Sequence, residues 1–90
     1  MTPEELERFK QKLVETTSFP SVYMFKFIVE SENRKIAMVE SLFDAEADLH
    51  TKESGNGRYT SITARQVVMD VDEVIDVYKK ASEIKGIIFL

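Results

Sequence analysis

Hydrophobic residues at helical spacing mark the beginning of the chain. Four of them fall on one face of a helix that we predict over residues 2–16: Leu6, Phe9, Leu13 and Val14. Thr2 and Glu5 are spaced as a capping box, and Pro3 suits the first helical position. Phe19-Pro20 then favours an extended backbone, because proline disfavours the helical conformation of the residue before it.

Residues 21–30 alternate as a strand and are rich in aromatic and β-branched side chains. One face holds Phe25, Phe27 and Val29, and the other holds Met24, Lys26 and Ile28. Because Lys26 is the only charged side chain among these six residues, we predict a strand in the middle of a sheet.

A second helix is predicted from about Asn33 to Phe43, with Ser31 or Asn33 as its cap. Its apolar stripe consists of Ile36, Val39 and Phe43, with Met38 and Leu42 at the margins. A more polar strand over residues 47–54 follows. The tract Ser54-Gly55-Asn56-Gly57 is typical of a hairpin turn, because glycine and asparagine adopt the positive φ that tight turns need.

The rest of the chain contains a strand, a helix and a short strand. Residues 58–69 alternate, with Ile62, Ala64 and Val68 on one face and Ser61, Thr63 and Arg65 on the other. Asp70 and Glu73 are spaced as a second capping box. The helix that follows carries its apolar positions at Val74, Ile75 and Tyr78, with Val71, Val77 and Ala81 nearby. Gly86 is expected to stop this helix before a terminal strand over residues 87–90.

The predicted order of elements is a helix followed by βαββαβ. Right-handed helical crossovers and one hairpin place both crossover helices on the same face of a four-stranded antiparallel sheet. The sequence therefore predicts an α+β, ferredoxin-like sandwich with strand order 4-1-3-2. Its domain covers residues 19–90, and residues 1–18 form an N-terminal helical extension.

Two apolar surfaces of this predicted fold need a cover. The terminal strand is an edge without a charge or a proline to block further pairing. Alternation sends Ile87 and Phe89 to one face and Ile88 and Leu90 to the other, so the helices can cover only one of these pairs. The N-terminal helix carries its own apolar stripe. Either that helix folds over its own sheet, or two copies join as a homodimer and bury both surfaces together; we favour the homodimer.

Composition and charge narrow the classes of partner. The chain has 90 residues, a hydrophobic fraction of 43% and a charged fraction of 31%, which is typical of one soluble globular domain. A net charge of -4 disfavours nucleic acid, which binds basic surfaces. No apolar run is long enough for a membrane span, and the acidic start differs from a secretory signal, so we expect a cytoplasmic protein.

Candidate metal ligands and catalytic residues are few. His50 lies two residues after Asp48, but a metal site needs a third ligand. The acidic residues from Asp44 to Asp48 lack the glycine and the bidentate glutamate of a calcium loop. Without cysteine, and with one histidine, no pair of nucleophile and base is visible. We therefore predict no enzyme, no metal and no cofactor.

Proteins of the predicted fold include acylphosphatases, metallochaperones and RNA-recognition motifs, and the sequence lacks the motif that each of them needs. An acylphosphatase needs a glycine-rich anion loop after the first strand, where this chain has residues 29–34 with two glutamates and no glycine. A metallochaperone needs a Cys-x-x-Cys pair. An RNA-recognition motif needs outward aromatic side chains on the central strands, where Lys26 and Ser61 are expected instead, so RNA binding is less favoured.

A small polar patch remains as the candidate site. If the strand faces are assigned correctly, Lys26 lies near Ser61, Thr63 and Arg65. Two cations with hydroxyl groups can bind an anion or the acidic surface of a partner. The structural alternative is an ordinary sheet face that is polar and wet.

Several residues also form a recognisable pattern. Phe19-Pro20 precedes the first strand, Lys26 lies within it, and Ser54-x-x-Gly57-x-Tyr59-x-Ser61-Ile62 covers the turn and the next strand. With Val74, Tyr78 and the apolar end, this pattern resembles the YbeD-like family of short bacterial proteins of unknown function, from Phe19 to Leu90. The resemblance implies a fold similar to the ACT domain, a regulatory module that binds small metabolites. It implies no catalytic or ligand-binding residues.

Two functional hypotheses follow. The first is a regulatory or protein-interaction module that binds a protein partner through its sheet face or sheet edge. The second is an ACT-like sensor that binds a small-molecule metabolite at the junction of two subunits. Stabilisation by one compound in a thermal-shift screen would favour the sensor, because a ligand that binds only the native state stabilises it.

Overall fold

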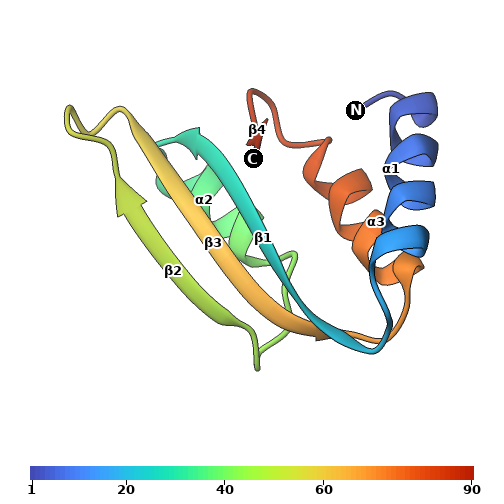
Figure 1. Ribbon diagram of the computed structural model, residues 1–90. Helices are drawn as coiled ribbons and strands as arrows, with labels where there is room; N and C mark the ends of the chain where they lie inside the picture. Colours follow the sequence, from blue (N-terminus) through green and yellow to red (C-terminus); the bar gives the residue numbers. More distant parts are fainter.

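The computed structural model describes residues 1–90 as three helices and one four-stranded sheet (Figure 1). In chain order the elements are α1 (Pro3–Thr16), β1 (Ser21–Glu30), α2 (Asn33–Glu40), β2 (Asp48–Glu53), β3 (Tyr59–Val68), α3 (Val71–Ala81) and β4 (Ile88–Phe89). Every pair of neighbouring strands is antiparallel, and the order across the sheet is β2-β3-β1-β4, which is 4-1-3-2 when taken from the β4 edge. The fold class is therefore α+β.

The register of the sheet confirms the predicted faces of its two long strands. Phe25 lies opposite Ala64 and Phe27 opposite Ile62, and these four side chains are at most 1% exposed. On the other face Lys26 lies opposite Thr63. As predicted, β1 is an inner strand, between β3 and β4.

Aromatic rings hold the helices on one face of the sheet. The ring of Phe25 lies 5.3 Å from that of Phe43, which follows α2, and 5.7 Å from that of Tyr78 on α3. Phe89 of β4 contacts Phe27 at 5.5 Å. Burial raises the pKa of the Tyr78 hydroxyl well above its ordinary range, so this phenol stays neutral as part of the core.

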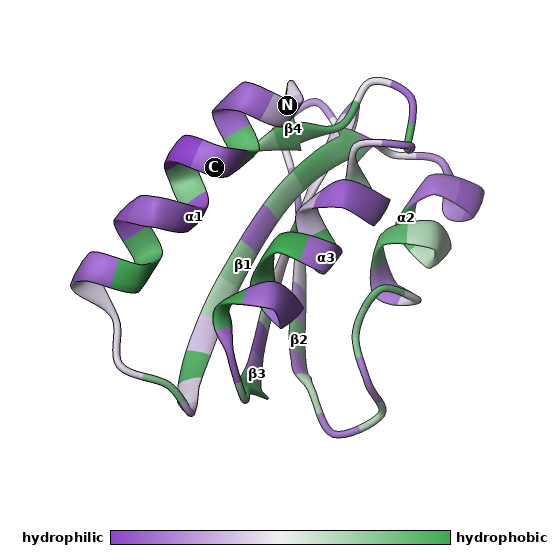
Figure 2. Cartoon of the chain, turned by 90° about the vertical axis from the view of Figure 1, so that its right-hand side faces the viewer, coloured by the Kyte–Doolittle hydropathy of each residue, from purple (hydrophilic) through white to green (hydrophobic).

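Helix α1 packs against α3 of its own chain. Leu6 and Leu13 are buried, Phe9 meets the ring of Tyr78 edge-on at 5.0 Å, and Lys10 pairs with Asp72 at 3.0 Å. Figure 2 shows the hydrophobic stripe of α1 turned toward the rest of the molecule. The stripe is thus covered within one chain, by α3 and not by the outer face of the sheet, and it needs no second copy.

Val14 is a correction to the predicted stripe. Its side chain is 54% exposed, although the heptad-like spacing placed it with Leu13. The covered stripe of α1 is narrow and consists of Leu6, Phe9 and Leu13. Val14 lies beside this stripe and therefore remains in solvent.

The capping predictions hold for α1 and in part for α3. Thr2 and Glu5 form the complete capping box at 3.0 and 3.1 Å. Asp70 accepts a hydrogen bond from the backbone N–H of Glu73, as predicted. The Glu73 carboxylate, however, accepts from the backbone N–H of Met69 instead of Asp70.

The ends of α2 and α3 differ from the prediction. The residue that caps α2 is Glu32, without a side-chain hydrogen bond, because the Ser31 hydroxyl is engaged with the buried Thr60 hydroxyl at 2.8 Å. Helix α2 ends at Glu40 and helix α3 at Ala81, earlier than expected, and turns continue each of them. Gly86, with a φ of 79°, therefore turns the chain into β4 and does not end α3 itself.

The hairpin between β2 and β3 confirms the turn prediction. Gly57 has a φ of 73° and its N–H donates to the Ser54 carbonyl at 2.9 Å. The Ser54 hydroxyl donates to the Asn56 side chain and accepts from the backbone N–H of Tyr59. Ser54 therefore closes the turn from both sides.

Candidate functional site

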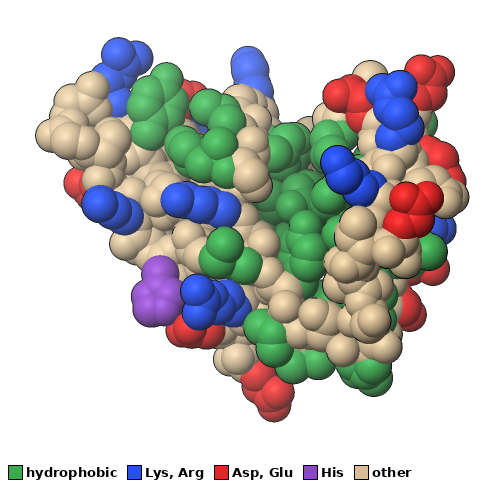
Figure 3. Space-filling model, in the orientation of Figure 1, with side chains coloured by type: hydrophobic (Ala, Val, Ile, Leu, Met, Phe, Trp, Pro, Cys, Tyr) green, Lys and Arg blue, Asp and Glu red, His purple; other side chains and the backbone are tan.

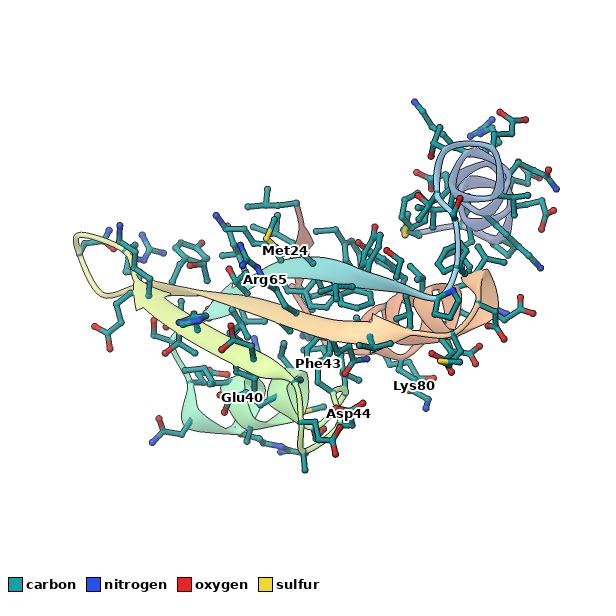
Figure 4. The ribbon with its side chains drawn as sticks, turned by 60° about the horizontal axis from the view of Figure 1, so that its bottom comes forward. Met24, Glu40, Phe43, Asp44, Arg65 and Lys80 are labelled. Carbon is teal, nitrogen blue, oxygen red and sulfur yellow. The ribbon has the colours of Figure 1, made fainter.

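The candidate site is the face of the sheet that no helix covers, which we call the open face. Figure 4 shows Met24 and Arg65 on this side, opposite to Phe43 and α2. Register assigns to it the side chains of Val22, Met24, Lys26, Ile28, Glu30, Asp48, His50, Lys52, Tyr59, Ser61, Thr63, Arg65, Val67 and Ile88.

The structure brings the four predicted patch residues together. Lys26 lies directly opposite Thr63, and Ser61 and Arg65 lie two residues to either side of Thr63 on the same face. On its other side Thr63 pairs with His50 of β2. The predicted patch is therefore one continuous surface across β1, β3 and β2.

The cations of this surface have no carboxylate partner. Lys26, Lys52 and Arg65 take part in none of the four ion pairs of the molecule. Asp48 lies opposite Arg65 in register, yet its carboxylate lies against the His50 ring, with Oδ1 and Nε2 3.2 Å apart. The positive charge of the open face is thus available to a ligand.

Apolar side chains lie between these cations. Val22, Met24 and Val67 are 66%, 52% and 58% exposed, and Ile88 at the β4 edge is 46% exposed. Figure 3 shows hydrophobic side chains beside lysines, arginines and the single histidine on this face. Exposed apolar residues that gather on one surface mark interaction sites more often than scattered ones do. Val22 and Val67, which lie opposite each other, were not among the predicted residues.

A shallow hollow lies at the hairpin end of the open face. Its volume is about 180 Å³, and its lining includes Ile28, Lys52, Tyr59 and Ser61. The guanidinium of Arg58 lies 5.8 Å from the centre of the Tyr59 ring. The hollow therefore combines an aromatic and an aliphatic wall with one lysine, Lys52, and one glutamate, Glu53.

The family-pattern residues have mostly structural places. Phe19 packs against the core beside Pro20, and Ser54 and Gly57 form the hairpin turn described above. Tyr59 is 38% exposed and lines the hollow together with the exposed Ser54, so both of these residues are available for contact.

The other residues that the sequence offered as metal ligands do not form a site. No group of three or more histidine, cysteine, aspartate or glutamate side chains lies close enough to hold a metal ion. The side chains of His50 and Asp48 are 71% and 63% exposed. In the acidic loop, the Asp44 carboxylate accepts a hydrogen bond from the backbone N–H of Glu46. These contacts are those of a surface loop and an edge strand.

A second hollow, which the sequence did not indicate, lies between α1 and α3. Its volume is about 560 Å³. Leu6 and Ile75 form its apolar floor, and Lys10, Asp76 and Lys79 lie at its rim. It can be recognised only once the packing of α1 on α3 is known.

The sequence is similar to one protein family and to curated bacterial proteins. The family model described as "Protein of unknown function (DUF493)" matches residues 14–90. A "UPF0250 protein" of Shewanella piezotolerans is 28% identical over 80 residues, which cover 84% of this chain and 91% of that protein. A "UPF0250 protein" of Shewanella halifaxensis is 29% identical over the same coverage. No solved structure matches, and no helix has the length and apolar character to cross a bilayer.

Proposed function

We propose that this chain is a non-enzymatic protein-interaction module. It belongs to the DUF493 family of proteins of unknown function, the YbeD-like small bacterial proteins. It acts in the bacterial cytoplasm, and binding through the open face regulates the protein that it contacts. The observation that carries this proposal is the combination of unpaired cations and exposed apolar side chains on the open face.

The charge of the open face selects the chemistry of the partner. The whole chain carries a net charge of -4, yet Lys26, Lys52 and Arg65 gather on this one surface without partners. Charge complementarity then favours a protein surface that combines carboxylates with apolar side chains. A second open face is a poor partner for a face-to-face contact, because the same cations would oppose one another.

The finer fold assignment belongs to the same proposal. We infer a ferredoxin-like, ACT-like sandwich at residues 19–90 with a helical extension at residues 1–18. The order of elements and the position of α2 and α3 on one face of the sheet support it. Fold alone does not determine function, so the open face and not the fold carries the functional argument.

Site-specific photocrosslinking in the bacterial host tests the proposal. A photoreactive phenylalanine analogue replaces Met24 at the centre of the open face. The matched control replaces Val14 on α1, which is 54% exposed while Met24 is 52% exposed. We expect a covalent adduct with one protein species from position 24 only.

Charge reversal makes this experiment specific. Lys26→Glu with Arg65→Glu should abolish the adduct from position 24, and the captured protein, purified, should bind the unmodified chain directly. Equal capture from positions 14 and 24, or capture that survives the charge reversal, would contradict the proposal.

A second candidate function has an observation of its own. The hollow between α1 and α3 has the volume of a typical small-molecule site. Its lining carries both signs of charge: Lys10 is paired with Asp72, and Lys79 lies among the carboxylates of Glu7 and Asp76. We therefore keep the ACT-like metabolite sensor as the alternative, with its site in this hollow of one chain instead of at the predicted junction of two subunits, and with a zwitterionic compound as its ligand.

A thermal-shift screen of amino acids and anionic metabolites tests the alternative. A ligand that binds only the folded chain raises Tm in a saturable way. The shift should disappear in Lys79→Ala and persist in Lys80→Ala, which removes a neighbouring lysine that does not line the hollow. An unchanged Tm with every compound would exclude these ligand classes.

A further inference from the structure

The two edges of the sheet are unequal. Strand β4 pairs with β1 over two residues, whereas β2 offers a six-residue edge from Asp48 to Glu53. Figure 1 shows β2 at the outer side of the sheet with no element beyond it. An unpaired edge of this length presents backbone N–H and C=O groups to solvent. The longer free edge for self-association is therefore β2 and not β4, where the sequence predicted it.

The backbone directions along β2 follow from the neighbouring hydrogen bonds. The N–H of Ser54 donates to the Tyr59 carbonyl, so Ser54 directs its backbone toward β3. In an antiparallel strand the N–H and C=O of one residue point to the same side, and those of the next residue point to the opposite side. Lys52, His50 and Asp48 therefore face β3, and Leu49 and Thr51 direct their backbone groups outward.

The side chains of β2 alternate between the two faces of the sheet. Asp48, His50 and Lys52 lie on the open face, with Asp48 and Lys52 placed symmetrically about His50. If a second copy of β2 runs antiparallel with His50 opposite His50, each Asp48 lies opposite Lys52 of that copy. The same register sets Leu49 opposite Thr51, so the outward backbone groups can form about four hydrogen bonds.

We propose that β2 pairs with β2 of a second copy about a two-fold axis at His50, which extends the sheet across both chains. The pairs of Asp48 and Lys52 occupy non-hydrogen-bonded positions, where side chains on neighbouring strands approach most closely. The two open faces then form one surface, and this inference does not depend on what binds that surface.

Other registers are less favourable. If the register shifts by one residue, the outward N–H and C=O groups of one copy lie opposite residues of the other copy whose backbone groups already bond β3, so no hydrogen bonds form between the copies. A pairing centred on Thr51 places His50 opposite Lys52, and one centred on Lys52 places two lysines opposite each other. Centring on Leu49 sets Asp48 opposite His50, and Lys52 then lies opposite Glu46, which is in the turn before β2 and outside the strand. The charges of β2 therefore discourage wrong pairings and permit the self-complementary one.

Charge exchange along the edge tests the proposal. The short contact predicts a weak dimer, whose fraction rises above about 100 µM in sedimentation equilibrium. Asp48→Lys sets lysine opposite lysine, and Lys52→Asp sets aspartate opposite aspartate, twice in each dimer. Each variant should associate at least about tenfold more weakly than the unmodified chain.

A mixture of the two variants supplies the decisive arm. In a heterodimer of Asp48→Lys with Lys52→Asp, both cross-strand pairs again join opposite charges, so association should return. Recovery in the mixture also shows that each variant is folded. A chain that stays monomeric at 1 mM (a concentration chosen as roughly tenfold above the expected onset), or a mixture that associates no better than its components, would overturn the proposal.

A cysteine at the axis tests the register independently, because the chain contains no cysteine. Opposed residues at a non-hydrogen-bonded position have Cα atoms about 4.5 Å apart, within the range of a disulfide. His50→Cys should therefore oxidise to a covalent dimer several times faster than Gln11→Cys, an exposed control on α1. Equal rates for the two variants would contradict pairing at His50.

Discussion

Alternate residues of β1 meet two different environments within one strand. Phe25, Phe27 and Val29 are at most 1% exposed beneath α2 and α3, whereas Met24 on the opposite face is 52% exposed. The open face therefore exposes apolar side chains, whereas the centre of the helix-covered face of the same sheet buries them. A sheet whose second face served only as a wet surface would carry polar side chains there. The difference shows which residues hold the fold and which are free to bind.

The largest expected effect separates these two faces directly. Phe27→Ala removes a fully buried ring that contacts Phe43, Tyr78 and Phe89, and it should lower the free energy of unfolding by about 3–5 kcal/mol. Met24→Ala on the open face should change it by less than about 0.5 kcal/mol. Denaturant titration of both variants measures the difference, and similar losses would contradict the assignment of faces.

Helix α1 allows the same comparison between a covered and an uncovered position. Phe9→Glu places a charge against Tyr78 and should cost about 1–3 kcal/mol of unfolding free energy in the monomer. Val14→Glu, in the last turn of the same helix, should be nearly neutral. If Phe9→Glu changed only the oligomeric state and not the stability, α1 would pack between chains and not on α3.

The hairpin offers a pair of glycines with different backbones. Gly57→Val should cost about 1–2 kcal/mol, because a φ of 73° strains a β-branched residue even without a close neighbour. Gly55 has no positive φ and open space around it, so Gly55→Ala should change Tm little. Equal effects in thermal unfolding would place the strained position elsewhere in the turn.

The smallest expected effect concerns an ion pair at the end of β1. The hydrogen bond from the Lys35 ammonium to the Glu30 carboxylate, 2.7 Å long, lowers the pKa of Glu30 below its ordinary value. A lowered pKa in the folded state contributes stability above the unfolded-state pKa, and this contribution is lost as pH falls through the folded-state value. The Tm difference between the unmodified chain and Glu30→Gln should therefore shrink between pH about 6 and 2. A difference that grows on acidification would contradict this pairing.

Most of the fold follows from local patterns in the sequence. Alternation at Phe25, Phe27 and Val29 predicted the covered face of β1, and the turn chemistry of Gly57 predicted the hairpin. The packing of α1 did not follow, because an apolar stripe such as that at Phe9 shows that a helix is covered but not by what. Ser31 was a wrong cap for a similar reason, since its hydroxyl pairs with Thr60 across 29 positions of sequence.

The candidate site was predicted in part. Strand parity alone placed Lys26 near Thr63 and Arg65, and the register confirms that neighbourhood. Val22 and Val67 were missed although strand parity sets them on the same face as Lys26 and Arg65, because the prediction considered only the polar side chains of that face. The hollow between α1 and α3 depends on tertiary packing throughout.

The central claim is that the open face binds a protein and contributes little to the fold. The most direct test measures, for Lys26→Glu with Arg65→Glu, both Tm and the affinity for the protein captured from position 24. A matched variant, Lys12→Glu with Lys80→Glu, reverses two exposed cations outside this face. The account predicts that only the open-face variant loses binding, by at least about tenfold, while both keep Tm within a few degrees. Binding retained by the open-face variant, or lost equally in the matched variant, would contradict it.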